Sequence, residues 1–232
     1  KIHAGILHDR QNKIHKHEMN KQKFPSLDLI VVNFYPFQKV VRHSKNSNNV
    51  VENIDIGGPT MVRAAAKNFK NVAIITNKND YQSLIREIEK NEGGTSLKFR
   101  EFMSSKAFGL TAYYDAMIAN WFNSKLNIQF PERKTIFGRR LSNLRYGENP
   151  HQKAKFFNDG SNVCGLITAN QIQGKELSYN NLLDTDAALR CCKDLKSIDP
   201  TKVAVVIVKH SNPCGAALAK SGREALDLSW SG

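Results

Sequence analysis

The sequence predicts an α/β protein built on a parallel β-sheet, and three segments support this fold class. The aliphatic stretch "LDLIVVNFYPF" at Leu27–Phe37 is typical of a buried strand running into a loop, and "NVAIITN" at Asn71–Asn77 indicates a second buried strand. A helix is expected between them at Thr60–Asn68. Because the order strand, helix, strand brings both strands into one parallel sheet, ligands are expected at the carboxyl ends of those strands.

Two further helices are expected after the second strand. The first begins near Asp80 and carries Leu84, Ile85 and Ile88 on one face. The second is longer, and its apolar and aromatic residues alternate at intervals of four and three, which predicts core packing rather than a cofactor site. These residues are Ala107, Thr111, Tyr114, Ile118 and Trp121.

A change of pattern after residue 123 predicts a second domain. The segment from Asn123 to Leu144 is rich in charge and has no clear periodicity, which is typical of a connection between domains. We therefore expect domains at 1–123 and 145–232, joined by a linker at 124–144. The second domain should contain a helix at Asp184–Leu195 and a buried strand at Val203–Val208, followed by a Pro-Cys-Gly turn.

Composition and length indicate a soluble globular chain of one large or two modest domains. It has 232 residues, 41% of them hydrophobic, and its apolar runs are far shorter than the roughly 20 residues that span a bilayer. Because the chain starts at Lys1 without an apolar signal segment, we expect a cytoplasmic protein truncated at its start. The four cysteines form no CxxC or CxxH spacing and are expected to be reduced thiols: Cys164, Cys191, Cys192 and Cys214.

The formal charge of +13, from 34 basic and 21 acidic residues, suits an anionic partner. Neither a zinc-finger spacing nor an RNP-type aromatic cluster accompanies this charge, and the lysines are scattered through Asn- and Ile-rich sequence. The pattern therefore favours a solvated basic surface or a phosphate-bearing small substrate over nucleic acid.

The segment "NIDIGGPTMVRAAAKN" is the first candidate site. Gly57 and Gly58 remove side chains where a strand passes into a helix, so a ligand can approach the backbone N–H groups and the positive helix end. Arg63 and Lys67 lie four apart on one helical face, and Asp55 is expected within reach of Lys67. On spacing alone, a glycine turn and a surface salt bridge explain the segment equally well.

The segment "VKHSNPCG" is the second candidate site. A buried strand delivers Lys209 and His210 at its end, where partial burial would tune a proton-transfer pair. A single strand-end histidine is usually structural, whereas a lysine beside it favours chemistry. Zinc is disfavoured, because Ala217 stands where the deaminase signature P-C-x-x-C needs a cysteine, and the H-x-E pattern is missing.

Five motifs in order, "NFYPF", "NIDIGGPTMVRAAAKN", "LRYGENPHQ", "YNNLLDTDAA" and "KHSNPCGAA", closely resemble the bifunctional enzyme family with AICAR transformylase and IMP cyclohydrolase activities. The resemblance runs over essentially the whole chain. It implies the end of a methylglyoxal-synthase-like (Rossmann-like) cyclohydrolase domain, then the start of a cytidine-deaminase-like transformylase domain without the metal. The family works as a homodimer on the purine nucleotides AICAR, FAICAR and IMP.

The resemblance also implies site residues for each reaction. In the cyclohydrolase, which needs no cofactor, the catalytic residues would be Tyr35, Asp55 and Lys67, and the nucleotide contacts Asn33, Ile56, Gly57 and Gly58. In the transformylase, which takes its formyl group from 10-formyltetrahydrofolate, the catalytic pair would be Lys209 and His210. The aminoimidazole nucleotide would be bound by Arg145, Tyr146 and Asn181.

The resemblance extends beyond both ends of the chain. The family's R-V-K-T-L-H-P segment, with a further catalytic lysine, would precede Lys1, and the folate pocket would follow Gly232. We therefore expect the isolated chain to have little or no activity. Two other hypotheses remain: a non-catalytic module of the same fold that binds purine nucleotides or RNA, and a structural remnant without a ligand.

Overall fold

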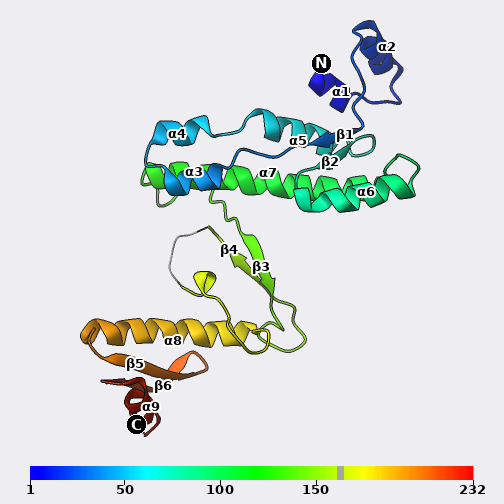
Figure 1. The fold of residues 1–232 in the computed structure, drawn as a ribbon. Helices are drawn as coiled ribbons and strands as arrows, with labels where there is room; N and C mark the ends of the chain where they lie inside the picture. Colours follow the sequence, from blue (N-terminus) through cyan, green and yellow to red (C-terminus); the bar gives the residue numbers. More distant parts are fainter. Residues whose placement is uncertain (161–164, 232) are drawn as a thin grey trace. The chain divides into compact units, whose positions relative to one another are not determined.

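A computed structural model describes residues 1–160 and 165–231, so Cys164 lies outside the described residues. It divides the chain into two compact units, Lys1–Phe137 and Gly138–Gly232 (Figure 1). The boundary falls inside segment 124–144, but this segment is not irregular throughout. A helix of the first unit continues to Lys125, and a strand of the second begins at Arg139.

Unit 1 combines one small parallel sheet with helices. The elements in order are α1 Ile2–Leu7, α2 Lys13–Lys21, β1 Leu29–Val31, α3 Phe37–His43, α4 Ser47–Glu52, α5 Gly57–Lys67, β2 Ala73–Ile75, α6 Tyr81–Lys90 and α7 Leu97–Lys125. A 3₁₀ turn, η1 at Lys78–Asp80, leads into α6. Among the described residues no helix is both long and apolar enough to cross a membrane.

Strands β1 and β2 pair in parallel, which confirms the predicted α/β arrangement with a parallel sheet. β2 is buried along its whole length. β1 is not, and here the prediction of a buried strand is wrong: Leu29 is 39% and Val31 47% exposed. Alternate residues of β1, such as Ile30, pack against the core, so only one face of this strand is covered.

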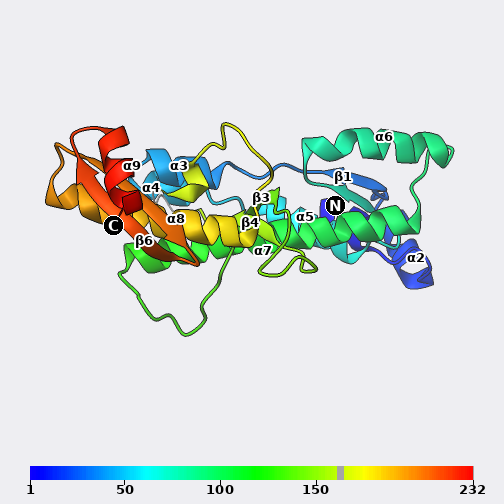
Figure 2. The ribbon, with the colours of Figure 1, turned by 90° about the horizontal axis from the view of Figure 1, so that it is seen from below.

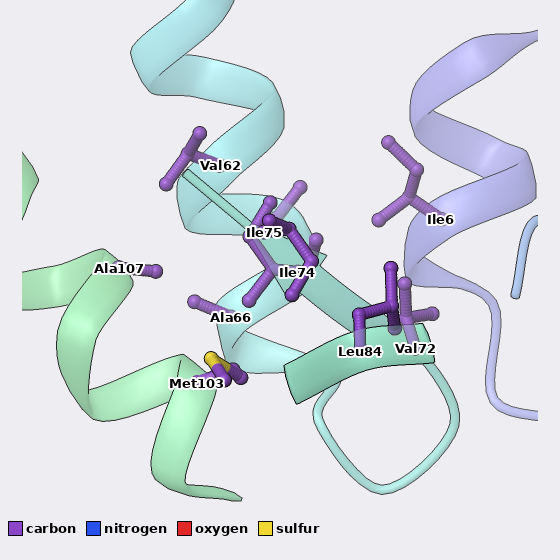
Figure 3. Close-up of a cluster of buried hydrophobic side chains, with 11 residues drawn as sticks. Ile6, Val62, Ala66, Val72, Ile74, Ile75, Leu84, Met103 and Ala107 are labelled. Atoms are coloured by element: carbon purple, nitrogen blue, oxygen red, sulfur yellow. The ribbon is translucent and has the colours of Figure 1, made fainter. Parts of the chain in front are cut away.

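The core of unit 1 lies between β2 and helices α5 and α7. Figure 3 shows Val62 and Ala66 of α5 on the side of the cluster that Ala107 and Met103 of α7 occupy, with Ile74 of β2 in the same cluster. Small residues at Ala64–Ala66 let α5 approach its neighbours closely, as the sequence indicated. Helix α7 runs beside α5 in both ribbon views (Figures 1 and 2).

Two helix predictions in unit 1 need correction. α5 begins at Gly57 rather than Thr60, because the glycines and Pro59 form its first turn. On α6, Leu84 is buried, but Ile85 is 46% exposed and faces away from the core.

The aromatic residues of α7 belong to the core, as predicted, since the Tyr114 ring meets the ring of Phe34 edge to face.

In the described part of unit 2 there are two antiparallel strand pairs, one long helix and one shorter helix. The elements are β3 Arg139–Asn143, β4 Lys155–Asn158, the 3₁₀ turn η2 Leu166–Thr168, α8 Tyr179–Ile198, β5 Val203–Lys209, β6 Asn212–Ala219 and α9 Gly222–Ser231. β3 pairs with β4, and β5 pairs with β6 as a hairpin. Helices α8 and α9 pack on opposite faces of this hairpin (Figure 1).

The structure corrects two predictions in unit 2. α8 begins at Tyr179 rather than Asp184, because Ser178 and Asn181 form a reciprocal capping box before it. Pro213, Cys214 and Gly215 are not a turn but the start of β6. The chain instead reverses three residues earlier, at His210 and Ser211, since Lys209 pairs directly with Asn212.

Two candidate active sites

Asp55 is the centre of the first site, at the amino end of α5. The residue is only 9% exposed, and both oxygens of its carboxylate accept backbone hydrogen bonds. Oδ1 accepts from the N–H of Gly58 at 2.8 Å, and Oδ2 from the N–H of Tyr35 at 3.3 Å. A carboxylate is favoured here because the helix terminus carries positive partial charge and free N–H groups. Asp55 thus ties the segment after β1 to the start of α5.

The two glycines of the motif have different roles in the structure. A Cβ atom at Gly58 would lie 2.6 Å from Oδ2 of Asp55, so glycine is required for the carboxylate to sit against the helix. A Cβ at Gly57 would meet nothing within 4 Å. Since the Gly58 N–H is already bonded to Asp55, the open backbone at Ile56 and Gly57 is the better approach for an anionic ligand.

Tyr114 of α7 supports this site from the core. Its hydroxyl accepts a hydrogen bond from the N–H of Asp55 at 2.8 Å, while the ring is 97% covered. Burial raises the pKa of the Tyr114 hydroxyl, and the nearby negative charges of Asp55 and Asp115 raise it further. The periodicity of the sequence predicted Tyr114 as a core residue but not its bond to Asp55. That bond could have been anticipated, because a buried tyrosine hydroxyl usually needs a hydrogen-bond partner.

The sequence suggested that Lys67 lies within reach of Asp55, but in the structure the two residues are far apart. Asp55 precedes the first turn of α5 and Lys67 is its last residue, so the 11-residue helix separates them by about 16 Å of rise. Among the described residues no ion pair joins the two. Asn33 and Tyr35 follow the carboxyl end of β1 and are exposed, as are Ile56 and Lys67.

The second site is the β5–β6 turn. His210 and Ser211 have φ angles of 52° and 61°, both in the left-handed region. Positive φ at both central residues is the pattern of a type I′ turn, which normally favours Asn-Gly. Side chains with a Cβ pay about 1–2 kcal/mol each to adopt this conformation. Such strain is typical of functional positions when surrounding contacts hold the backbone in place.

Contacts to α8 hold this turn. Asp184 Oδ1 accepts a hydrogen bond from the N–H of Ser211 at 2.7 Å. At the other end of β5, the Lys196 ammonium donates to the carbonyl of Lys202 at 2.9 Å. The two bonds show that β5 runs back along α8. The strand covers about 20 Å at about 3.3 Å per residue, which matches the helix length from its end back to Asp184.

The segment after β3 is tied to the start of the same helix. The N–H of Arg145 donates to the carbonyl of Leu177 at 2.9 Å, and the N–H of Tyr179 to the carbonyl of Tyr146 at 3.1 Å. These bonds place Arg145 and Tyr146 next to the first turn of α8, where Asn181 lies. The Arg145 guanidinium stacks over the Tyr146 ring at 4.9 Å.

Asn181 has a structural task in addition to its predicted one. Its Oδ1 accepts from the N–H and from the hydroxyl of Ser178 at 3.1 and 3.0 Å. The cap therefore uses the amide oxygen and leaves the amide nitrogen as the group that could donate to a ligand. The turn, the cap and Arg145 all meet the first two turns of α8.

Residues 1–160 and 165–231 contain no group of three or more His, Cys, Asp or Glu side chains that could hold a metal ion. In the same residues Cys191, Cys192 and Cys214 are free thiols. Burial on the inner face of α8 raises the pKa of Cys192, and neighbouring Cys191 raises it further.

Comparison with known families identifies the class of protein. The model of the AICARFT/IMPCHase bienzyme family matches residues 65–232, and the chain belongs to this family. The resemblance inferred from the five motifs is thereby confirmed.

Two individual relatives share one name. The chain is 46% identical over 230 residues to the bifunctional purine biosynthesis protein PurH of Bradyrhizobium diazoefficiens, covering 97% of this chain and 43% of that protein. It is 43% identical to PurH of a Ruegeria species over 99% of this chain and 43% of that protein. The chain thus spans about two fifths of the length of these relatives. A crystal structure of ForH is 30% identical, with a TM-score of 0.45 over 53% of this chain and 63% of that one.

Proposed function

We propose that the complete protein encoded with this chain catalyses the last two steps of IMP biosynthesis. The first transfers a formyl group from 10-formyltetrahydrofolate to the amine of AICAR. The second closes the product FAICAR to IMP with loss of water. The proposal rests on family membership together with one observation: Tyr35 and Gly58 are bonded to Asp55 in unit 1, and the turn after Lys209 is bonded to α8 in unit 2. Lys67 is not part of the bonded set, because it lies at the other end of α5.

For ring closure we assign the chemistry to the cluster in unit 1. The carboxamide nitrogen attacks the formyl carbon, and one hydrogen from each of the two nitrogens leaves with the formyl oxygen as water. Asp55 assists proton removal, and Tyr35 beside it orients and shuttles protons. The proton-shuttle role of Lys67 rests on the family motif alone, because this residue lies at the other end of α5. The oxyanion is held by the backbone N–H groups of Ile56 and Gly57, because the N–H of Gly58 is already bonded to Asp55. Asn33 completes the nucleotide contacts.

For formyl transfer we assign the chemistry to the turn in unit 2. The AICAR amine forms a bond to the formyl carbon, and the bond from that carbon to the folate nitrogen breaks. His210 takes the proton from the attacking amine, while Lys209 gives a proton to the departing nitrogen. Arg145, with its planar guanidinium, holds the phosphate, while Tyr146 and Asn181 contact the nucleotide.

The finer fold assignments belong to the same proposal. Unit 1 would be the end of a methylglyoxal-synthase-like domain and unit 2 the start of a cytidine-deaminase-like one, with boundaries near 123 and 145. The small parallel sheet of unit 1 supports the first assignment. We propose further that the complete protein is a cytoplasmic homodimer, and that the 232-residue chain alone is inactive, because it spans about two fifths of its relatives.

The proposal is tested with the complete reading frame that encodes this chain, assayed for both reactions. Lys67→Ala should lower ring closure by about 10²-fold and leave formyl transfer unchanged, and Lys209→Ala should do the reverse. Arg63→Ala is a matched control on the same exposed face of α5, and Lys220→Ala is an exposed lysine at the far end of β6.

Each outcome is informative. Wild-type protein that forms IMP, with variants that separate the two reactions, supports the two-site assignment. Wild-type protein that binds AICAR but forms neither product supports the non-catalytic nucleotide-binding module instead. Ring closure that survives Lys67→Ala removes this residue from the mechanism.

A further inference from the structure

The β5–β6 turn follows Lys209 and holds His210, the other residue of the proposed transformylase pair, in a backbone conformation that residues with a Cβ disfavour. Both central residues, His210 and Ser211, carry a Cβ and have positive φ. Both residues of the pair are also exposed, so core packing does not hold them in place. A contact from outside the turn must therefore stabilise its conformation.

Two hydrogen bonds to the backbone of the turn stabilise this conformation. In a two-residue turn the ladder bonds link Lys209 and Asn212, which leaves the N–H of Ser211 outside the ladder. That N–H donates to Asp184 at 2.7 Å, and the carbonyl of His210 accepts from the Asn212 side chain at 2.9 Å. The second contact is local to the turn, whereas the first crosses 27 positions to a different element.

We propose that Asp184 is a positioning residue of the transformylase site, an inference that rests on the proposed function. It acts through the turn and does not touch substrate. Its carboxylate fixes the Ser211 N–H to the second turn of α8, three residues after Asn181. The same helix therefore sets the distance between the nucleotide contacts at its first turn and the proton-transfer pair.

The main test is formyl transfer by the complete protein carrying Asp184→Ala. Removing the acceptor frees the turn, so kcat should fall by about ten- to a hundredfold, the loss expected for misplaced catalytic groups. KM for AICAR should stay within about twofold, because Arg145 and the Ser178–Asn181 cap are untouched. Ring closure in the same preparation should be unchanged and reports that unit 1 is folded, while the retained KM for AICAR reports that unit 2 is folded.

Two further variants separate positioning from charge and from folding. Asp184→Asn keeps an oxygen acceptor of the same shape, and should retain at least about half of the wild-type kcat. Asp184→Ala combined with Ser211→Gly should recover part of the lost kcat, because glycine adopts positive φ without strain. Asp186→Ala is the control: this carboxylate lies on the same helix and pairs with Arg190 at 2.8 Å.

The results distinguish this inference from the function on which it rests. If wild-type protein transfers no formyl group, the proposed function fails and the positioning role falls with it. If wild type is active and Asp184→Ala matches it, only the positioning role is wrong. Loss of transfer in Asp184→Asn with ring closure intact would also overturn it, since the hydrogen-bond acceptor would then not be what matters.

Discussion

The two candidate sites hold their chemical groups in opposite ways. In unit 1 the acid, Asp55, is itself buried and makes the bonds that organise its surroundings. In unit 2 Lys209 and His210 are exposed, and a neighbouring helix supplies the bond that holds their turn. The difference predicts where each site is sensitive: the first to changes that touch Asp55, and the second to changes in α8, α9 and the hairpin between them.

The largest effect is expected at Gly215, on the face of the hairpin opposite α8. A Cβ there would overlap the carbonyl oxygen of Ser229 in α9, which is backbone and cannot swing away. Gly215→Ala should therefore destabilise unit 2 by about 3 kcal/mol, measured by chemical denaturation. Gly222→Ala is the control, because its new methyl group would meet Val203 at an ordinary 3.9 Å. Equal stability of the two variants would contradict the packing described.

The second prediction contrasts the two glycines before α5. Gly58→Ala pushes the Asp55 carboxylate away from the helix, and should cost about 1–3 kcal/mol and reduce ring closure. Gly57→Ala has room and should raise stability by about 0.4–1 kcal/mol, because alanine leaves the unfolded chain fewer conformations to lose. A fall in ring closure without loss of stability in Gly57→Ala would indicate that a ligand approaches this backbone. Equal effects of the two substitutions would argue against the geometry.

A third prediction concerns Tyr114→Phe, which removes the acceptor for the buried Asp55 N–H. The unpaired donor should cost about 1–3 kcal/mol at neutral pH. Because the folded protein raises the pKa of Tyr114 above its ordinary 10.0, its stabilising contribution is present below pH 10.0 and is lost as pH rises through the folded value. The difference between wild type and variant should therefore narrow in strongly alkaline solution.

Unfolding of unit 1 can be followed for this comparison through Trp121, which packs in its core against Phe37. The chain has two tryptophans, so a Trp230→Phe background leaves Trp121 as the single probe. A wild-type advantage that is independent of pH up to strongly alkaline solution would contradict the proposed linkage.

The smallest effect is expected at Glu87, on the surface of α6. Its carboxylate accepts a hydrogen bond from the N–H of Ser96 at 2.8 Å, and hydrogen bonding by Ser96 lowers the pKa of Glu87 below its ordinary 4.5. Stability from this group is present above pH 4.5 and is lost as pH falls through the lowered value. In Glu87→Gln the melting temperature should fall slightly less as the pH is lowered below 4.5 than it does in wild type, as measured by thermal scans at a series of pH values. An unchanged acid limb would contradict the assignment.

The sequence predicted the features that follow from local pattern and missed those that depend on distant partners. The parallel pairing and the core stripe of α7 were predicted, because continuous aliphatic strands and helical spacing report burial directly. The exposure of Leu29 and Val31 was missed, since the same aliphatic run fits a strand covered on one face or on both.

The candidate sites divide in the same way. Motif order identified the family, and Asp55, Tyr35 and Gly58 meet as one bonded set. The expected contact between Lys67 and Asp55 was wrong, because the residues between them form a helix that separates them by its full length. The turn was predicted three residues too late, because "NPCG" contains proline and glycine, whereas His210-Ser211 lacks the Asn-Gly type of pair that normally marks a type I′ turn.

The most direct test of two independent sites is a complementation assay in solution. Full-length Lys67→Ala and Lys209→Ala proteins are each supplied with AICAR and 10-formyltetrahydrofolate, alone and as an equal mixture, and IMP is measured. Either variant alone should form almost no IMP. The mixture should form it readily, because FAICAR made by Lys67→Ala can be closed by Lys209→Ala. A mixture as inactive as its components would mean that the two lysines serve one shared site, and would contradict the account.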